Sequence, residues 1–149
     1  MSVNIVAIGG GAGTFNVLYG LKKNTTYNLS AIISVADSGG TTGAIRDKYG
    51  ILPPGDMRRA IAALAKDTDM VRKLFEYSFS EEEGVIGSNK IGNILLTALV
   101  DIERDYEKCI NVMCDMFDVR GRVIPVTLED VHLAVRFEDG TIVEGEKNI

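Results

Sequence analysis

Hydrophobic positions in the first 35 residues alternate between short β-branched runs and helical spacing. Val3–Ile8 is a β-branched run that ends at a glycine, and it predicts a buried strand. Apolar residues then recur at helical spacing from Phe15 and predict a helix that closes near Lys23. A polar loop over 24–28 leads to Leu29–Val35, which predicts a second buried strand. Strand, glycine-rich corner, helix and strand begin a doubly wound parallel sheet.

The middle of the chain has the spacing of consecutive helices. A short helix is predicted over 44–49, and longer ones over 56–65 and 68–79. The broadest apolar face belongs to a helix over 91–102, and the same spacing repeats over 106–117. This block is long for a connection between two strands of one sheet.

After residue 120 the hydrophobic period changes to that of strands. Residues 123–126 predict a strand, and 132–137 alternates towards Asp139-Gly140 before 141–143 returns. Asp-Gly between such runs predicts a β-hairpin. The fold class is therefore α/β, a Rossmann-like doubly wound sheet with a C-terminal β-hairpin. Because only two N-terminal strands precede the helical block, we expect residues 1–149 to be a single Rossmann-like domain truncated at its C-terminal end.

Composition favours a folded chain, with 46% hydrophobic and 25% charged residues. The net charge is -5, and without a basic stripe we expect no nucleic-acid partner. No apolar stretch is long enough for a membrane span and no signal-peptide pattern is visible, so a cytoplasmic protein is predicted. Cys109 and Cys114 are five apart in one predicted helix, too far round it for an easy disulfide. They are interpreted as small core or semi-buried residues in a reducing compartment.

The first glycine-rich corner is Gly9-Gly10-Gly11-Ala12-Gly13, between a predicted strand and a predicted helix. Glycines let the backbone approach an anion, and the N–H groups and dipole of a helix start favour negative charge. The corner therefore predicts a phosphate-binding loop. The G-x-G-x-x-G fingerprint is incomplete, because Thr14 or Asn16 stands where the third glycine belongs. A tight turn without a ligand is the alternative.

The second corner begins at Asp37 and continues through Ser38, Gly39 and Gly40. In a dinucleotide-binding fold an acid at the end of the second strand contacts a ribose hydroxyl. Because glycines and threonines follow at once, a second anion cradle, a metal-assisted site and a solvated turn all remain open.

The third corner, Pro53-Pro54-Gly55-Asp56, leads directly into a helical run. Asp56 is predicted as the N-cap, with Arg58 and Arg59 behind it at the rim of the helix start. An ordinary capped helix after a rigid turn is the alternative. Further along, Lys90 is placed to reach a phosphate and Asn93 lies near the start of the next helix, where capping is again the alternative. His132, the only histidine, is interpreted as structural.

Taken in order, these blocks resemble the YvcK-type gluconeogenesis factor family, which is related to the 2-phospho-L-lactate transferases (CofD-like). The matching motifs, between Ile8 and Leu99, are Ile-Gly-Gly-Gly-x-Gly, Val-Ala-Asp-x-Gly-Gly-x-x-Gly, Ile-Leu-Pro-Pro-Gly-Asp-x-Arg and Gly-Asn-x-Leu-Leu-x-Ala-Leu. The Pro-Pro-Gly-Asp block is the specific one.

The resemblance implies a Rossmann-like fold of about twice this length and a nucleotide-linked ligand, a UDP-sugar in the YvcK branch. By position, the implied ligand-binding residues are Gly9, Gly10, Gly11, Gly13, Thr14, Asp37, Gly39, Gly40, Asp56, Arg58 and Asn93. Asp37 and Asp56 are also the implied carboxylates of a metal site, with Mg²⁺ as the candidate ion. No catalytic residue is assigned.

Two functions follow from the resemblance. The first is a non-catalytic UDP-sugar-binding regulator of central carbon and cell-wall metabolism, connected with cell shape and with protein partners in cell-wall synthesis. The alternative is a Mg²⁺-dependent transferase that moves a phospho-lactyl-type group from a nucleotide diphosphate donor. Ser38 replaces a second acid of the family pattern, which weighs against the metal-dependent transferase. Ser88-Asn89 replaces Gly-His, which removes a polar contact of the family pattern. An isolated half should expose an apolar patch beside the first strand or along 91–102, with a homodimer as one expected result.

Overall fold

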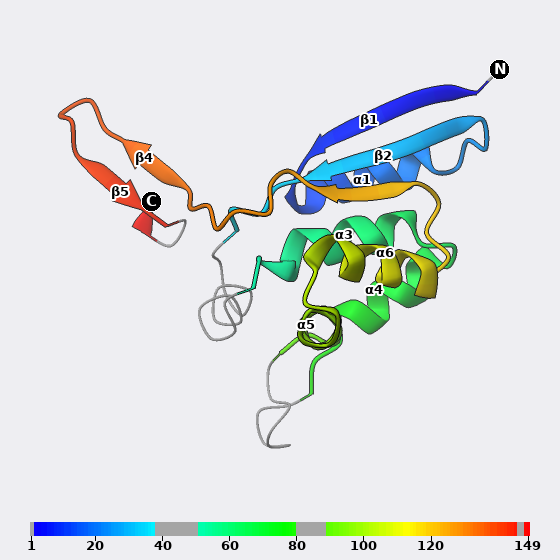
Figure 1. The fold of residues 1–149 in the computed structure, drawn as a ribbon. Coiled ribbons are helices and arrows are strands. Elements are labelled where there is room, and N and C mark those ends of the chain that lie inside the picture. The colour runs from blue at the N-terminus through cyan, green and yellow to red at the C-terminus, as the bar shows by residue number, and fades with distance from the viewer. Residues whose placement is uncertain (1, 38–50, 80–88, 146–147) are drawn as a thin grey trace.

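The computed structural model describes residues 2–37, 51–79, 89–145 and 148–149 (Figure 1). The helix predicted over 44–49 lies outside the described residues. In the described part, three strands form a parallel sheet in the order β1-β2-β3: β1 (Val3–Gly9), β2 (Tyr27–Ile33) and β3 (Arg122–Pro125). This architecture confirms the predicted α/β fold class.

The helices gather on one side of this sheet (Figure 1). Their bounds are α1 (Gly11–Leu21), α3 (Pro54–Leu64), α4 (Thr68–Glu76), α5 (Ile91–Glu103) and α6 (Tyr106–Met116). None of the helices in the described ranges combines the length and apolar character needed to cross a membrane.

The centre of the helical layer is α3, in which every residue except Asp56 and Arg59 is buried. Its small side chains, with alanine at three of the four positions 60–63, let neighbouring elements approach closely on several sides. It packs against α1, α4, α5, α6 and the strands β2 and β3. The core of the molecule therefore lies between α3 and the inner face of the sheet.

The outer face of the sheet is open. Val6 and Ile8 of β1 are 55% and 75% exposed, whereas Ile5 and Ala7 pack against the core. The prediction that β1 is a buried strand is therefore wrong for its outer face. β1 lies at an edge of the sheet, and no described helix covers this side.

The burial of α5 also differs from the prediction. Its most buried residues are Gly92, Asn93 and Leu96, while Ile102 on the predicted apolar face is 72% exposed. The helix has hydrophobic residues on more than one side, so its period alone did not identify the side that meets the core.

The C-terminal hairpin consists of β4 (Ala134–Arg136) and β5 (Ile142–Glu144), and it confirms the Asp-Gly prediction. Gly140 has a φ of 88°, and the Asp139 carboxylate accepts a hydrogen bond from the Thr141 N–H at 2.8 Å. The hairpin reaches away from the helices and the main sheet (Figure 1).

Both cysteines lie on α6 and are free thiols. Burial raises the pKa of the Cys109 thiol and raises that of Cys114 to about 11. The two thiols are therefore protonated at neutral pH, in agreement with the packing role predicted for them.

The hydroxyl of Tyr106 is buried without a hydrogen-bond partner. Because an unpaired buried hydroxyl is costly, we expect Tyr106→Phe to raise the free energy of unfolding by about 1 kcal/mol in urea denaturation. Tyr77→Phe, at an exposed tyrosine, is the matched control and should change little. A loss of stability in Tyr106→Phe would mean that the hydroxyl is paired after all.

Candidate functional site

The first glycine corner forms the junction between β1 and α1. Gly9 ends the strand, Gly10 is the N-cap residue, and Gly11 begins the helix with a φ of 68°, a conformation that favours glycine. No side chain caps α1 and no acidic residue lies in its first turn. The first backbone N–H groups of a helix have no partner within it, so they are available to an anion.

Gly13 belongs to the helix and not to the turn. A Cβ there would meet nothing within 4 Å. It can contribute a first-turn N–H, but its position does not require glycine, unlike that of Gly11.

Asp56 lies directly against the glycine corner. A Cβ on Gly10 would come within 2.4 Å of the Asp56 Oδ2. The helix α3 begins at Pro54 after Pro53, so Asp56 is its third residue and the prediction that it caps this helix is wrong. Its side chain is 12% exposed and forms an ion pair with Arg59 at 2.9 Å, between Oδ1 and Nη1.

Thr14 holds the corner in shape. Its hydroxyl donates to the carbonyl oxygen of Gly10 at 2.9 Å, and a Cβ on Gly9 would approach the Thr14 Oγ1 to 2.6 Å. Thr14 therefore stabilises the backbone of the corner, from a position in α1 about one turn after Gly10 and Gly11.

A cavity of about 360 Å³ opens at this corner, at the carboxyl ends of β1 and β2. It is lined by Gly10, Gly11, Ser34, Ala36, Asp37, Asp56, Arg59 and Leu133. The structure therefore brings together the first corner, the acid of the second corner and the acid of the third. Gly39 and Gly40 lie outside the described residues.

Arg58 and Lys90 are engaged elsewhere. The buried Arg58 guanidinium, 3% exposed, donates to the Glu76 Oε1 at 2.5 Å, and the Lys90 ammonium pairs with the same carboxylate. Partial burial alone would raise the pKa of Glu76, but the hydrogen bonds from Lys90 and Arg58 outweigh it and lower that pKa. This network joins α3 and α4 to the start of α5.

Asn93 is fully buried in the first turn of α5, and neither its amide oxygen nor its amide nitrogen has a partner. It does not line the cavity at the glycine corner. A Cβ on the preceding Gly92 would meet the Phe75 ring at 2.8 Å and the Arg58 Cδ at 3.1 Å, so the start of α5 packs tightly against α3 and α4.

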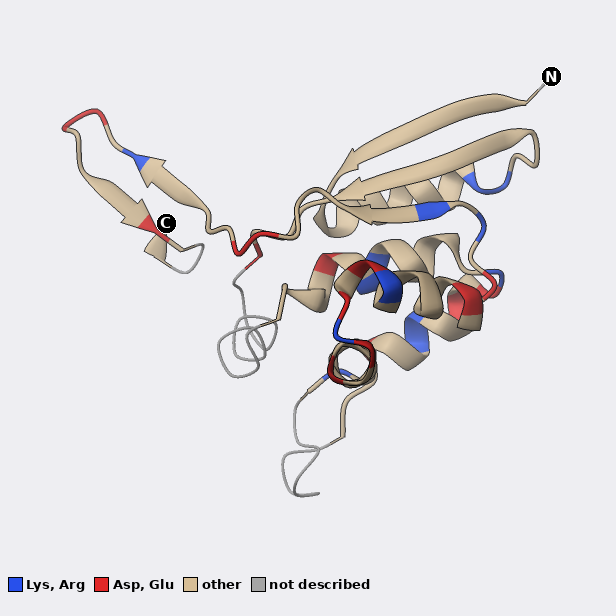
Figure 2. Ribbon diagram, in the orientation of Figure 1, with Lys and Arg blue, Asp and Glu red and all other residues tan. Residues whose placement is uncertain are grey.

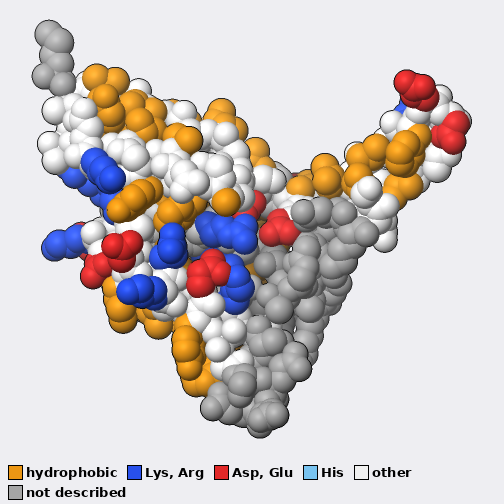
Figure 3. All heavy atoms as spheres, turned by 180° about the vertical axis from the view of Figure 1, so that it is seen from behind, with side chains coloured by type: hydrophobic (Ala, Val, Ile, Leu, Met, Phe, Trp, Pro, Cys, Tyr) orange, Lys and Arg blue, Asp and Glu red, His pale blue; other side chains and the backbone are white. Residues whose placement is uncertain are grey.

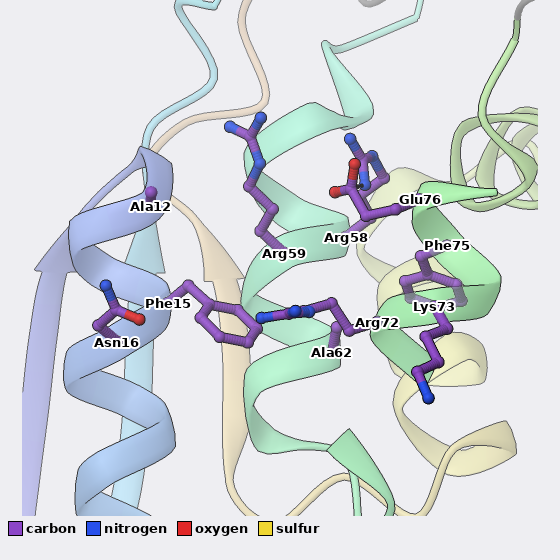
Figure 4. Close-up of a pocket in the computed structure, with 10 residues that line it drawn as sticks. All are labelled: Ala12, Phe15, Asn16, Arg58, Arg59, Ala62, Arg72, Lys73, Phe75 and Glu76. Atoms are coloured by element: carbon purple, nitrogen blue, oxygen red, sulfur yellow. Dashed lines mark hydrogen bonds and ion pairs between the residues drawn. The ribbon is translucent and has the colours of Figure 1, made fainter. Parts of the chain in front are cut away.

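A second cavity, of about 420 Å³, lies between α1, α3 and α4 (Figure 4). It is lined by Ala12, Phe15, Asn16, Arg58, Arg59, Ala62, Arg72, Lys73, Phe75 and Glu76. The Arg72 guanidinium lies 5.8 Å from the centre of the Phe15 ring. Sequence reasoning did not select Phe15, Arg72 or Lys73 as site residues, and the adjacent basic pair on a helix is the only signal the sequence holds for them.

The only histidine of the sequence, His132, lines neither cavity. His132 is exposed, precedes β4, and has its Nε2 3.7 Å from the Asp130 carboxylate. Across the described ranges, no three histidine, cysteine, aspartate or glutamate side chains form a group that could hold a metal ion.

Residues 5–149 match the protein family described as 2-phospho-L-lactate transferase CofD. The chain belongs to the CofD family. Within this family the chain is similar to proteins named gluconeogenesis factor, in agreement with the resemblance found in the sequence. It is 43% identical over 145 residues to the gluconeogenesis factor of Listeria innocua, covering 97% of this chain and 44% of that protein. It is 38% identical over 146 residues to that of Halalkalibacterium halodurans, covering 98% of this chain and 45% of the relative.

The fold of this CofD-family chain is also that of a solved relative. An X-ray crystal structure of a protein from Bacillus halodurans matches it with a TM-score of 0.91 and 36% sequence identity. The match covers 99% of this chain and 47% of the Bacillus chain. The chain thus spans less than half the length of these relatives.

The close approach of Asp56 to Gly10 can be tested by stability. Gly10→Ala should lower the free energy of unfolding by about 1–3 kcal/mol, because its Cβ collides with the carboxylate. Gly20→Ala on α1, where a Cβ meets nothing, is the matched control and should raise stability by about 0.5–1 kcal/mol. In an Asp56→Ala background the cost of Gly10→Ala should shrink. An equal loss of stability from Gly10→Ala in both backgrounds would mean that the strain does not come from contact with the Asp56 carboxylate.

The Glu76 network predicts a pH-dependent stability. Because the folded-state pKa of Glu76 is lowered, its contribution is present above the unfolded pKa, near about 4.3, and is lost as the pH falls through the folded value. The stability difference between the wild type and Glu76→Gln should therefore be largest at neutral pH and shrink under acidic conditions. Denaturation curves across this range measure it, with Glu138→Gln on the hairpin as control. A difference independent of pH would contradict this assignment.

Proposed function

We propose that this chain carries the phosphate-binding side of a UDP-sugar site in a non-catalytic regulatory protein of the gluconeogenesis factor type. The observation that carries the proposal is the cavity in which the uncapped start of α1, through Gly10 and Gly11, meets Asp37 and Asp56. Backbone N–H groups of this kind bind phosphate oxygens without a side chain.

The two acids make the site unfavourable for a bare diphosphate. Asp37 and Asp56 line the same cavity as the helix start, and the chain as a whole has a net charge of -5. Arg59 offsets part of this charge through its ion pair with Asp56. A phosphate-bearing ligand therefore needs a further positive charge at this position.

Mg²⁺ fits this donor set. Its sites in proteins use one or two carboxylates and complete the coordination with water and phosphate oxygens, which is what two acids on one open cavity offer. When bound, the ion would neutralise the diphosphate. Asp37 and Asp56 would hold it, Arg59 would orient Asp56, and the N–H groups at Gly10 and Gly11 would hold the phosphate oxygens.

The names of the relatives favour the gluconeogenesis factor type over the transferase. The curated relatives cited above are named gluconeogenesis factor, whereas the transferase name comes from the description of the family. Protein partners in cell-wall synthesis and a cytoplasmic location remain predictions of the family resemblance. Transfer of a phospho-lactyl-type group by this protein would favour the alternative.

Ligand contact at the glycine corner is tested by following backbone amide NMR signals during titration with UDP-glucose and Mg²⁺. We expect saturable shifts at Gly10, Gly11 and Ala12, and at least about tenfold weaker binding in Gly11→Val, because a β-branched side chain strains the turn and blocks close approach. Gly20→Val, at the other end of the same helix, controls for the cost of valine in α1.

The alternatives give different patterns in the same titration. Shifts confined to the second cavity, around Phe15 and Arg72, would move the ligand away from the glycine corner. Unchanged affinity in a folded Gly11→Val protein would also contradict the proposal.

The role of Asp56 is separable from its contribution to folding. We expect Asp56→Asn to abolish the gain in UDP-glucose affinity that Mg²⁺ gives, because the amide is a poor ligand for the ion. The loss of its ion pair with the half-exposed Arg59 should cost stability only about 0.5–1 kcal/mol. Asp69→Asn removes an acid from the first turn of α4 and is the matched control. Calorimetry of UDP-glucose binding with and without Mg²⁺ measures this gain in both variants. An intact Mg²⁺ effect in Asp56→Asn would exclude Asp56 as a ligand of the ion.

A further inference from the structure

The second cavity, between α1, α3 and α4, has a surplus of positive charge. Four basic side chains line it, and the described lining residues include one acid: Arg58, Arg59, Arg72, Lys73 and Glu76. Basic residues occur on both α3 and α4 (Figure 2), and in the view from behind lysine and arginine side chains gather over the helices below the sheet (Figure 3). Because the whole chain has a net charge of -5, this surplus is local and indicates a site for an anion.

Two of these cations are available to a ligand. Among the described residues, no ion pair joins Arg72 or Lys73 to an acid. The Arg72 guanidinium lies over the ring of Phe15, and a guanidinium held by a ring face keeps its in-plane N–H donors for an acceptor. Lys73 points away from the arginines (Figure 4), so it contributes charge rather than a direct contact.

A third cation of the cavity is buried and only partly satisfied. Glu76 pairs with both Arg58 and Lys90, so its charge is already offset and does not cancel the other cations. Arg58 is 3% exposed, and its Nε has no hydrogen-bond partner. A buried charged donor without an acceptor is costly, and a ligand oxygen would remove that cost. This observation points to an anion independently of the number of charges.

The cavity also has the size and the walls of a small-molecule site. Its volume of about 420 Å³ lies within the usual range for such sites, roughly 300–1,000 Å³. Phe15 on α1 and Phe75 on α4 lie on opposite sides of Ala62, whose single methyl group leaves the space between them open (Figure 4). Guanidinium groups bind phosphate through paired N–H donors. Charge and walls together fit a small organic molecule with a phosphate group.

We propose that the second cavity binds the phosphate group of a compact organic phosphate. Arg59 and Arg72 hold the phosphate oxygens from α3 and α4, and the buried Arg58 supports them with its charge and its unpaired Nε. The organic part lies against Phe15 and Phe75. Among the described residues this site shares only Arg59 with the cavity at the glycine corner, so a ligand here is separate from the nucleotide proposed there.

Arg59 couples the two sites. Its Nη1 pairs with the Asp56 carboxylate at the glycine corner, and a phosphate in the second cavity would compete for the same guanidinium. Asp56 would then be less neutralised, and a further negative charge would lie nearby, so Mg²⁺ would bind more tightly at the corner. This consequence rests on the proposed function of the corner, whereas the anion site itself does not.

The test titrates the 149-residue chain with glycerol 3-phosphate and, separately, with inorganic phosphate, without nucleotide or Mg²⁺. We expect saturable NMR shifts at the Arg72 side-chain Nε–H and at the amides of Phe15 and Arg72. Arg72→Gln should weaken this binding about tenfold, because a charge-assisted hydrogen bond is lost. Lys23→Gln is the matched control and should leave the affinity unchanged, because Lys23 is also an exposed cation beside a ring, 4.7 Å from the centre of Tyr19, but lies outside the cavity.

The two ligands distinguish the sources of the phosphate group. Glycerol 3-phosphate should bind more tightly than inorganic phosphate, because its carbon atoms contact the aromatic walls. Equal affinities would assign the cavity to free phosphate and overturn the organic ligand. The absence of saturable shifts with both ligands, or shifts that Arg72→Gln leaves unchanged, would overturn the site.

The coupling has its own measurement. In the presence of saturating glycerol 3-phosphate, the affinity for Mg²⁺ at the glycine corner should rise about fivefold in the wild type and stay unchanged in Arg59→Gln. An equal rise in both proteins would exclude Arg59 as the connection.

The two proposals fail in different ways. Phosphate shifts confined to Gly10 and Gly11, removed by Gly11→Val and kept in Arg72→Gln, would reject the second site alone. Shifts at Phe15 and Arg72 with either phosphate, in a protein whose corner amides do not respond to UDP-glucose and Mg²⁺, would reject the nucleotide site alone.

Discussion

The burial of α3 on nearly every side is the constraint on which the rest of the structure depends. The helix contacts α1, α4, α5, α6 and two strands, and its alanines let these elements approach closely. Because it is held from several directions, its first turn has one position relative to the sheet. That position places Asp56 against Gly10 and Arg58 against Glu76. Packing in the core thus sets the geometry of the polar groups at both cavities.

The charges around α3 are arranged as two separate pairs. Asp56 with Arg59 faces the glycine corner, while Arg58 with Glu76 fastens α3 to α4. Consecutive arginines on a helix point in directions about 100° apart, so one is buried and the next is half exposed. Among the described residues, only Arg59 lines both cavities.

Local patterns predicted the elements well because they depend on local chemistry. Glycines after a β-branched run located the junction of β1 and α1, and Asp139-Gly140 located the hairpin. Features that depend on long-range contacts could not be predicted. Periodicity did not reveal that β1 has one open face, or which side of α5 meets the core. Because α3 starts at Pro54, directly after Pro53, Asp56 lies inside the helix and does not cap it. Its carboxylate lies against the glycine corner instead. No sequence pattern connects Phe15 to Arg72, which meet only because α1 and α4 lie on either side of α3.

The pairing of β2 with β3 has a consequence for the order of folding. β1, α1 and β2 are consecutive, so their contacts close only short loops. Ser30 of β2, in contrast, pairs with Arg122 of β3, and the whole helical block lies between them. Closing so long a loop costs chain entropy before the strand pair returns any stability, which slows this step. Until β3 arrives, the central strand of the sheet has an open edge, and a nascent chain in this state is exposed to intermolecular strand pairing.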